Sequence, residues 1–238
     1  MNNTTVSICT PTYNRVNFIN GLIVNIINQD YPKYLIEWVI VDDGEDKTEE
    51  IIEKSKNKLG EIKIVYVKLP KKVCLGKKRN IMHKYCTGNI LVYMDDDDYY
   101  PPTRVSHAVE MLNKNPKLLC AGCSKIYVYF MDTKNIYHFG PYHSYHATAN
   151  TFAFRRELLE QTKYDDNDVL GEESKFLKNY QIPIIQLNTL KTILVISHQF
   201  NTFDKKQILK QGKKSKNAMN HFTSSGFSQQ TYSNNIKI

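Results

Sequence analysis

The chain has 238 residues, of which 41% are apolar and 24% are charged, with 10 Gly and 8 Pro. This composition excludes collagen-like, wholly disordered and disulfide-scaffold proteins, and the length suits one large domain or two small ones. The formal net charge of +8 lies almost entirely near the C-terminus, because seven of the 32 basic residues and no acidic residue follow position 204. The preceding part carries the other 25 basic residues against 24 acidic ones.

Short runs rich in β-branched residues alternate with helical patterns in the first half of the chain. The apolar runs predict four buried strands, at residues 6–10, 38–41, 62–67 and 90–94. The 3.6-residue periodicity predicts four helices, at residues 18–27, after 46, at 76–85 and from 102 onwards. Strands separated by such helices indicate βαβ units and a mainly parallel sheet.

The second half begins with a long apolar and aromatic run at residues 118–130, which we interpret as strand. Further patterns follow, a strand at 151–154, a helix after Gly171 and a strand at 192–197. No Gly/Ser-rich linker interrupts the body of the chain. We therefore expect one α/β domain followed by a tail.

Cys120 and Cys123 lie in the long apolar run with C-x-x-C spacing, but the chain contains no second such pair. We interpret them as small buried residues rather than zinc ligands. The five cysteines are odd in number and irregularly spaced, which suits a reducing compartment. No secretory signal pattern and no run of about 18 apolar residues occur. We expect a cytoplasmic protein, with a membrane-peripheral location as the alternative.

Residues 205–238 are interpreted as a solvated, lysine-rich C-terminal tail. Contact of this tail with phosphate groups, anionic lipid or an acidic partner is the alternative. A nucleic-acid partner is not expected, because the basic residues lie in a polar segment rather than in a folded groove.

Polar clusters follow three of the predicted strands, at residues 10–15, 42–44 and 95–98. In open α/β sheets, ligands bind beyond the carboxyl ends of the strands, so these clusters would share one edge. Residues 95–98 are four consecutive aspartates, whose mutual repulsion calls for a compensating cation. Hard oxygen ligands suit Mg²⁺ or Mn²⁺. A solvated acidic turn is the alternative, and it fits poorly at the end of a buried strand.

The order and spacing of four motifs resemble those of glycosyltransferase family 2; these motifs lie at residues 6–15, 39–44, 76–80 and 94–99. A looser match to the family is found at residues 151–156, 171–173 and 198. The resemblance implies a GT-A fold over residues 1–204, with a nucleotide-binding half at 1–115 and an acceptor-binding half at 116–204. It also implies a nucleotide-diphosphate sugar donor, UDP being the expected nucleotide, and a divalent metal, Mn²⁺ or alternatively Mg²⁺. The acceptor, whether glycan, lipid or protein, is not indicated.

The resemblance also assigns site residues by position. The expected nucleotide-binding residues are Thr10, Thr12, Tyr13, Arg15, Asp42, Asp43, Arg79, Asp95 and Asp96. Asp42 would accept a hydrogen bond from the base, Asp43 would support that turn, and Arg79 would approach the nucleotide or diphosphate. Lys77 and Lys78, next to Arg79, are interpreted as ordinary helix-surface lysines.

Asp95 and Asp97 match the D-x-D motif, in which Asp97 would bind the metal and Asp95 the ribose or the metal. Asp98 is expected to orient the loop. His198 would be a further metal ligand, although a lone histidine near a strand end is more often a polar surface residue.

Glu173 is the expected catalytic base and Glu172 the expected contact to the acceptor hydroxyl. The family commonly has Asp at the second of these positions, and acids in the first turn of a helix are also favoured by its dipole alone. His143 and His146 lie in a loop that could contact donor sugar or acceptor, yet loop histidines without a partner pattern are more often structural.

An inverting transfer needs one base and one metal, and the chain offers candidates for both. A nucleotidyltransferase is an alternative, but residues 10–15 lack the Gly-rich loop typical of such enzymes. A catalytically inactive binding module acting through the basic tail is the other alternative.

Overall fold

The computed structural model describes residues 3–169 and 171–230. Its large sheet contains, in spatial order, β3 (Lys63–Lys68), β2 (Ile36–Asp42), β1 (Val6–Thr12), β4 (Ile90–Tyr93), β8 (Ala153–Arg155), β5 (Cys120–Gly122) and β9 (Ile184–Gln186). The β3-β2-β1-β4 half and the β5–β9 pair are parallel, and β8 runs antiparallel to both neighbours, β4 and β5. The prediction of a mainly parallel α/β sheet is therefore confirmed.

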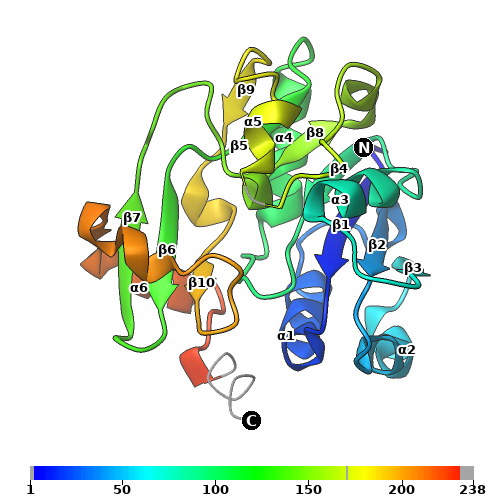
Figure 1. The fold of residues 1–238 in the computed structure, drawn as a ribbon, viewed down its shortest axis with the longest axis horizontal. Helices are drawn as coiled ribbons and strands as arrows, with labels where there is room; N and C mark the ends of the chain where they lie inside the picture. Colours follow the sequence, from blue (N-terminus) through cyan, green and yellow to red (C-terminus); the bar gives the residue numbers. More distant parts are fainter. Residues whose placement is uncertain (1–2, 170, 231–238) are drawn as a thin grey trace.

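Helices cover both faces of this sheet (Figure 1). Their bounds are α1 (Val16–Ile27), α2 (Thr48–Leu59), α3 (Leu75–His83), α4 (Arg104–Lys114) and α5 (Glu172–Phe176). Successive side chains of a strand point to opposite faces, so Ile8 of β1 packs in one apolar cluster and Cys9 in the other. The central strands read as continuous apolar runs because both faces are buried.

A second sheet contains β10 (Val195–Ser197), β6 (Ile126–Phe130), β7 (Asn135–Phe139) and β11 (Lys213–Lys214), in this order. The run at residues 118–130, expected as one strand, thus divides into β5 and β6, which belong to different sheets. Cys120 and Cys123 are both buried free thiols, as expected. Short 3₁₀ helices lie at Lys33–Leu35, Ala149–Thr151, Arg156–Glu160, Thr189–Lys191 and Lys205–Gln211.

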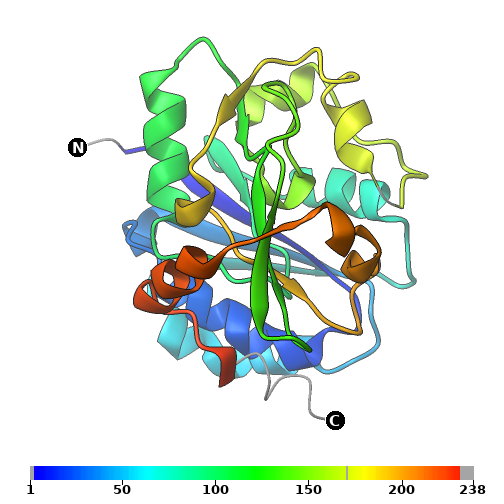
Figure 2. The same ribbon diagram turned by 90° about the vertical axis from the view of Figure 1, so that its left-hand side faces the viewer.

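Residues 205–230 differ from the expected solvated tail. Figure 2 shows the segment after β10 crossing the β6–β7 hairpin, and β11 pairs antiparallel with β7. In α6 (Lys216–Ser224), Phe222 is fully buried, and Phe227 beyond it is 3% exposed. Both rings pack against Tyr99. The lysines of β11 are exposed. The lysine-rich composition of this segment thus belongs to its surface, while its buried aromatic residues attach it to the fold.

No helix in the described ranges is long and apolar enough to cross a membrane.

Candidate active site

A cleft of about 680 Å³ opens where β1 and β4 end, bordered by α3 and by the loop that precedes α5. Predicted site residues that line it are Thr12, Tyr13, Arg15, Arg79, Asp95, Asp96 and Asp97. Lysines also line it, namely Lys71, Lys72, Lys77 and Lys78. The cleft therefore brings cationic side chains close to the acidic run at the end of β4.

Thr10 and Asp42 lie behind the wall of the cleft, although the motif comparison places both in the nucleotide pocket. The Thr10 hydroxyl donates to the carbonyl of Met94 (2.8 Å) and accepts a hydrogen bond from the Trp38 indole (3.0 Å). The fully buried carboxylate of Asp42 accepts hydrogen bonds from the Gly44 amide (2.7 Å), the Lys68 ammonium (3.0 Å) and the Tyr66 hydroxyl. Both side chains are thus bonded to protein groups.

Lys78 is buried, which corrects its interpretation as a surface lysine. It is 5% exposed, donates to the carbonyl of Thr12 at 2.9 Å and forms an ion pair with Asp43. Asp43 also accepts a hydrogen bond from the amide of Val73 at 2.8 Å. Burial lowers the pKa of Lys78 although Asp43 acts in the opposite direction. Its neighbour Lys77 is exposed on the surface of α3. The Asp43–Lys78 pair therefore holds the end of β1, α3 and the loop before α3 together.

The four consecutive aspartates have different environments. Burial, with the charge of Asp97, raises the pKa of Asp96 well above its usual value and raises that of Asp98 to about 7. Burial also raises the pKa of Asp95, against the charge of Arg79. Burial alone would raise the pKa of Asp97 too, but the hydrogen bond from His198 and nearby cations lower it. Asp97 is therefore the carboxylate that is most firmly ionised.

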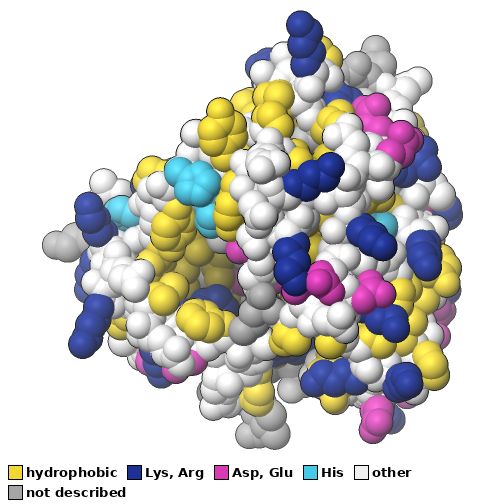
Figure 3. Space-filling model, turned by 45° about the horizontal axis from the view of Figure 1, so that its top comes forward, with side chains coloured by type: hydrophobic (Ala, Val, Ile, Leu, Met, Phe, Trp, Pro, Cys, Tyr) yellow, Lys and Arg dark blue, Asp and Glu magenta, His cyan; other side chains and the backbone are white. Residues whose placement is uncertain are grey.

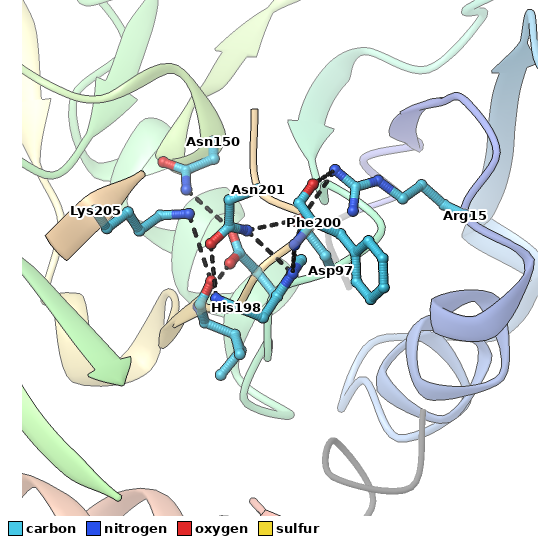
Figure 4. Close-up of polar contacts among 9 residues, drawn as sticks. Arg15, Asp97, Asn150, His198, Phe200, Asn201 and Lys205 are labelled. Atoms are coloured by element: carbon cyan, nitrogen blue, oxygen red, sulfur yellow. Dashed lines mark hydrogen bonds and ion pairs between the residues drawn. The ribbon is translucent and has the colours of Figure 1, made fainter. Parts of the chain in front are cut away.

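Asp97 and His198, both expected as metal ligands, are in direct contact, and Figure 4 shows their interactions. The His198 Nε2 lies 3.1 Å from Asp97 Oδ2, and the Asn201 amide donates to the same oxygen at 3.1 Å. The Arg15 guanidinium lies 3.7 Å from Asp97 and donates to the carbonyl of Phe200 at 2.5 Å. Asp97 thus links the loop after β1 to the loop after β10.

Asp98 orients this region, as expected. Its carboxylate accepts hydrogen bonds from the amide of Ile196 in β10 (2.9 Å) and from the side chain of Asn150 (3.0 Å). Lys205 donates to the carbonyl of Ile196 at 3.4 Å, and its charge lowers the pKa of Asp97 and of Asp98 (Figure 4). Lys205 and Asn150 were not predicted as site residues. Lys205 belongs to a lysine-rich segment and Asn150 to the short 3₁₀ helix Ala149–Thr151, and neither sequence position gave a signal of this contact.

Arg79 connects the acidic run to α5. Arg79 lies in α3, which begins in close contact with the loop before α5. A Cβ added at Gly76 would lie only 2.0 Å from the carbonyl oxygen of Asp165, so this approach requires glycine. The buried Arg79 guanidinium donates to Glu172 (Nε–Oε1 3.1 Å) and lies 3.6 Å from Asp95 Oδ1. Burial alone would lower the pKa of Arg79, but Asp95 and Glu172 raise it well above its usual value.

Glu173 follows Glu172 in the first turn of α5 and is not among the residues that line the cleft. Gly171 precedes α5 with φ 69°, a left-handed conformation that glycine tolerates best. Burial raises the pKa of Glu173, and the charge of Glu172 adds to this. The two glutamates therefore differ: Glu172 is paired with Arg79, whereas the proton affinity of Glu173 is increased.

The side chains around Asp97 include donors for a divalent metal. Among the described residues no group of three or more His, Cys, Asp or Glu side chains is arranged around a common point. Asp97 and His198 form a two-ligand pair at 3.1 Å, while Asp95 faces Arg79. Asp95 Oδ1 is buried and accepts no hydrogen bond. Carboxylate and imidazole donors of this kind suit a divalent cation in chemistry.

Comparison with known proteins identifies relatives. The family described as "Glycosyl transferase family 2" matches residues 7–167. The poly(ribitol-phosphate) β-N-acetylglucosaminyltransferase TarS of Staphylococcus aureus is 33% identical over 110 residues, which are 46% of this chain and 19% of TarS. An uncharacterised glycosyltransferase of Rickettsia typhi is also 33% identical over 110 residues, 46% of this chain and 32% of that protein. The matched region thus spans about a fifth to a third of these relatives.

Solved structures share the fold. The mannosyltransferase PcManGT of Pyrobaculum calidifontis, in complex with GDP-Man and Mn²⁺, superposes with a TM-score of 0.68 at 16% identity, covering 98% of this chain and 73% of that one. The structure of TarS residues 1–349 in complex with UDP superposes with a TM-score of 0.63 at 18% identity, covering 96% of this chain and 68% of that one. The GT-A fold predicted from the motifs is therefore confirmed.

Proposed function

The chain belongs to glycosyltransferase family 2, and we propose that it transfers a sugar from a UDP-sugar to an acceptor hydroxyl, with inversion at the anomeric carbon. The observation that carries the proposal is the cleft in which arginine and lysine side chains lie beside three aspartates. Cationic side chains suit a diphosphate, and carboxylates suit a divalent cation bound to it. TarS, similar in sequence and in fold, was solved with UDP and with UDP-GlcNAc, which supports UDP.

In this proposal Asp97 and His198 hold Mn²⁺, or alternatively Mg²⁺, with Asp95 as a further ligand or ribose contact. The ion would supply stabilisation of the charge that develops on the leaving diphosphate. Arg15 already lies 3.7 Å from Asp97, so its guanidinium is placed to contact a phosphate bound next to that carboxylate. Tyr13, with the Lys72 ammonium 4.0 Å from its ring centre, offers an aromatic face at the cleft wall.

Glu173 acts as the base. As the acceptor oxygen forms its bond to the anomeric carbon, the hydroxyl proton passes to Glu173 Oε, and the bond from that carbon to the diphosphate oxygen breaks. The raised pKa of Glu173 suits this role, because a base is most effective when its pKa lies near the working pH. Glu172, held by Arg79, positions the start of α5 relative to the cleft.

The test is UDP release from UDP-GlcNAc, UDP-glucose and UDP-galactose with Mn²⁺, with water as the acceptor. Glu173→Gln should lower kcat by about 100-fold or more without weakening UDP binding. Glu160→Gln, a change at an exposed acid, is the control. Full turnover in Glu173→Gln would refute its assignment as base. UDP binding without turnover of any donor by the wild type would instead favour an inactive binding module.

A further inference from the structure

A cluster of aromatic and imidazole rings lies beside α5, outside the donor cleft. Tyr142 and His146 have ring centres 4.8 Å apart, and Tyr180 lies 5.1 Å from His143 and 5.4 Å from His146. These four residues are called the ring cluster below. Histidine and hydrophobic side chains adjoin one another along the edge of a hollow in Figure 3. Tyr142 is 51% exposed, so the cluster is open to a ligand.

The cluster is rigidly supported from the loop side. Ser124 Oγ accepts hydrogen bonds from the amides of Tyr142 (2.8 Å) and His143 (3.1 Å). The side chain of Gln186 in β9 donates to the carbonyls of Ser144 and His146, both at 2.9 Å. The backbone of residues 142–146 is therefore bonded to β9 and to the link between β5 and β6, which fixes the position of the cluster's loop.

Backbone strain accompanies the cluster on the α5 side. Lys178, Asn179 and Tyr180 have φ of 51°, 54° and 60°, three successive left-handed residues of which none is glycine. Such conformations cost free energy and persist where the surroundings fix them, often at functional sites. Here the turn directs the chain after α5 so that the Tyr180 ring meets both histidines.

One further observation indicates a ligand rather than a packed core, and a second concerns the position of the cluster relative to Glu173. The buried Nδ1 of His146 makes no hydrogen bond within the described chain. Tyr180 follows α5, the helix whose first turn carries Glu173, and the amide of Leu177 between them donates to the carbonyl of Glu173 at 2.9 Å. The ring cluster therefore includes a residue of the turn directly after the helix that carries the proposed base, and none of its four members lines the donor cleft.

We infer that the ring cluster binds the acceptor, and that this acceptor presents a neutral pyranose ring. This inference rests on the proposed function. Aromatic faces attract the C–H edges of a ligand through their electron-rich surfaces, and a few polar groups fix its orientation. The C–H face of a pyranose would lie against Tyr180 and Tyr142. A ring hydroxyl would bond to His146 Nδ1, and another would point to Glu173.

Saturation-transfer NMR tests this inference on the full chain with UDP and Mn²⁺. The probes are the methyl β-pyranosides of glucose, galactose and N-acetylglucosamine, with ribitol 5-phosphate as an open-chain, anionic comparison. We expect at least one pyranoside to receive saturation on the protons of one ring face. Tyr142→Ala and His146→Ala should each reduce this signal at least five-fold. Tyr145→Ala removes an equally exposed tyrosine (54%) of the same loop that lies outside the cluster, and should retain it.

Two results would overturn the inference. One is the absence of saturation on every pyranoside, whether or not ribitol 5-phosphate is saturated, and the other is a pyranoside signal that Tyr142→Ala and His146→Ala leave unchanged. A UDP-induced thermal shift, measured on the same samples, separates this inference from the proposed function. UDP binding without any pyranoside contact refutes the ring cluster as acceptor site alone. Pyranoside contact without UDP binding refutes the donor assignment alone.

Discussion

Arg79 Nε lies 3.1 Å from Glu172 Oε1, and the same guanidinium lies 3.6 Å from Asp95 Oδ1. One buried cation therefore joins the acidic run at the end of β4 to the first turn of α5. The donor side and the acceptor side of the proposed reaction are thus coupled by a single side chain. A disturbance at either carboxylate leaves an uncompensated charge in a buried position, which is costly.

Lys78 and Lys77 are neighbours on α3, the first buried and the second exposed. Their substitution should therefore change the free energy of unfolding by different amounts. Lys78→Met leaves the Asp43 carboxylate buried without its cation, so the free energy of unfolding should fall by about 3–5 kcal/mol. Lys77→Met changes an exposed residue and should alter it by less than about 0.5 kcal/mol. Urea unfolding of both variants measures the difference. Equal stability would contradict the buried position of Lys78.

His198 should contribute to metal affinity. In His198→Asn, the Mn²⁺ concentration that half-saturates the UDP-dependent thermal shift should rise about ten-fold or more, since even indirect partners of a metal site contribute 10–100-fold. His221→Asn changes an exposed histidine of α6 and is the matched control. An unchanged Mn²⁺ requirement in His198→Asn would show that the Asp97–His198 contact is structural only.

The decrease of kcat at low pH should reflect the protonation of Glu173. A base must be ionised, so kcat falls as pH falls through the pKa of Glu173. Burial raises this pKa above the usual 4.5, and the loss should therefore begin at a higher pH than for an exposed glutamate. The folded chain also holds this proton more tightly than the unfolded chain, so the contribution of Glu173 to stability decreases as pH rises from 4.5 through the raised pKa. A pH profile of kcat, with urea unfolding at each pH, measures both effects.

The segment after residue 204 should contribute to stability. Phe222→Ala removes a fully buried ring from the cluster around Tyr99 and should cost about 3–5 kcal/mol. Phe203→Ala removes a ring that is 39% exposed and should cost less. Thermal unfolding compares the two. A tail detached from the fold would give no loss for Phe222→Ala.

Sequence patterns predicted the first half of the fold well, because each strand is an apolar run and each helix has a single apolar face. They predicted the second half less well. β9 and β11 were not predicted, because they are only three and two residues long and their partners, β5 and β7, are distant in sequence. The division of residues 118–130 between two sheets likewise depends on tertiary packing.

The same limit applies to the site. The family resemblance named Asp97 and His198 as ligands of one metal, whereas no local pattern shows that the ends of β4 and β10, which belong to different sheets, lie close together. The contacts of Lys78 and Lys205 could not be predicted, since burial of a lysine depends on which carboxylate or carbonyl lies opposite. Nor could spacing show that Asp42 is already bonded to Tyr66 and Lys68.

The most direct test of the central claim is UDP binding, measured as the change in Tm on thermal unfolding with and without Mn²⁺. The proteins compared are the wild type, Asp97→Asn and the exposed-site control Asp30→Asn. A ligand at about 100 times its Kd adds roughly 2.7 kcal/mol, which for a domain of this size shifts Tm by about 5–10 °C. We predict such a shift with UDP and Mn²⁺ in wild type and Asp30→Asn, and its loss in Asp97→Asn. A shift that is absent in wild type, or equally large in Asp97→Asn, would contradict a metal-dependent UDP site in this cleft.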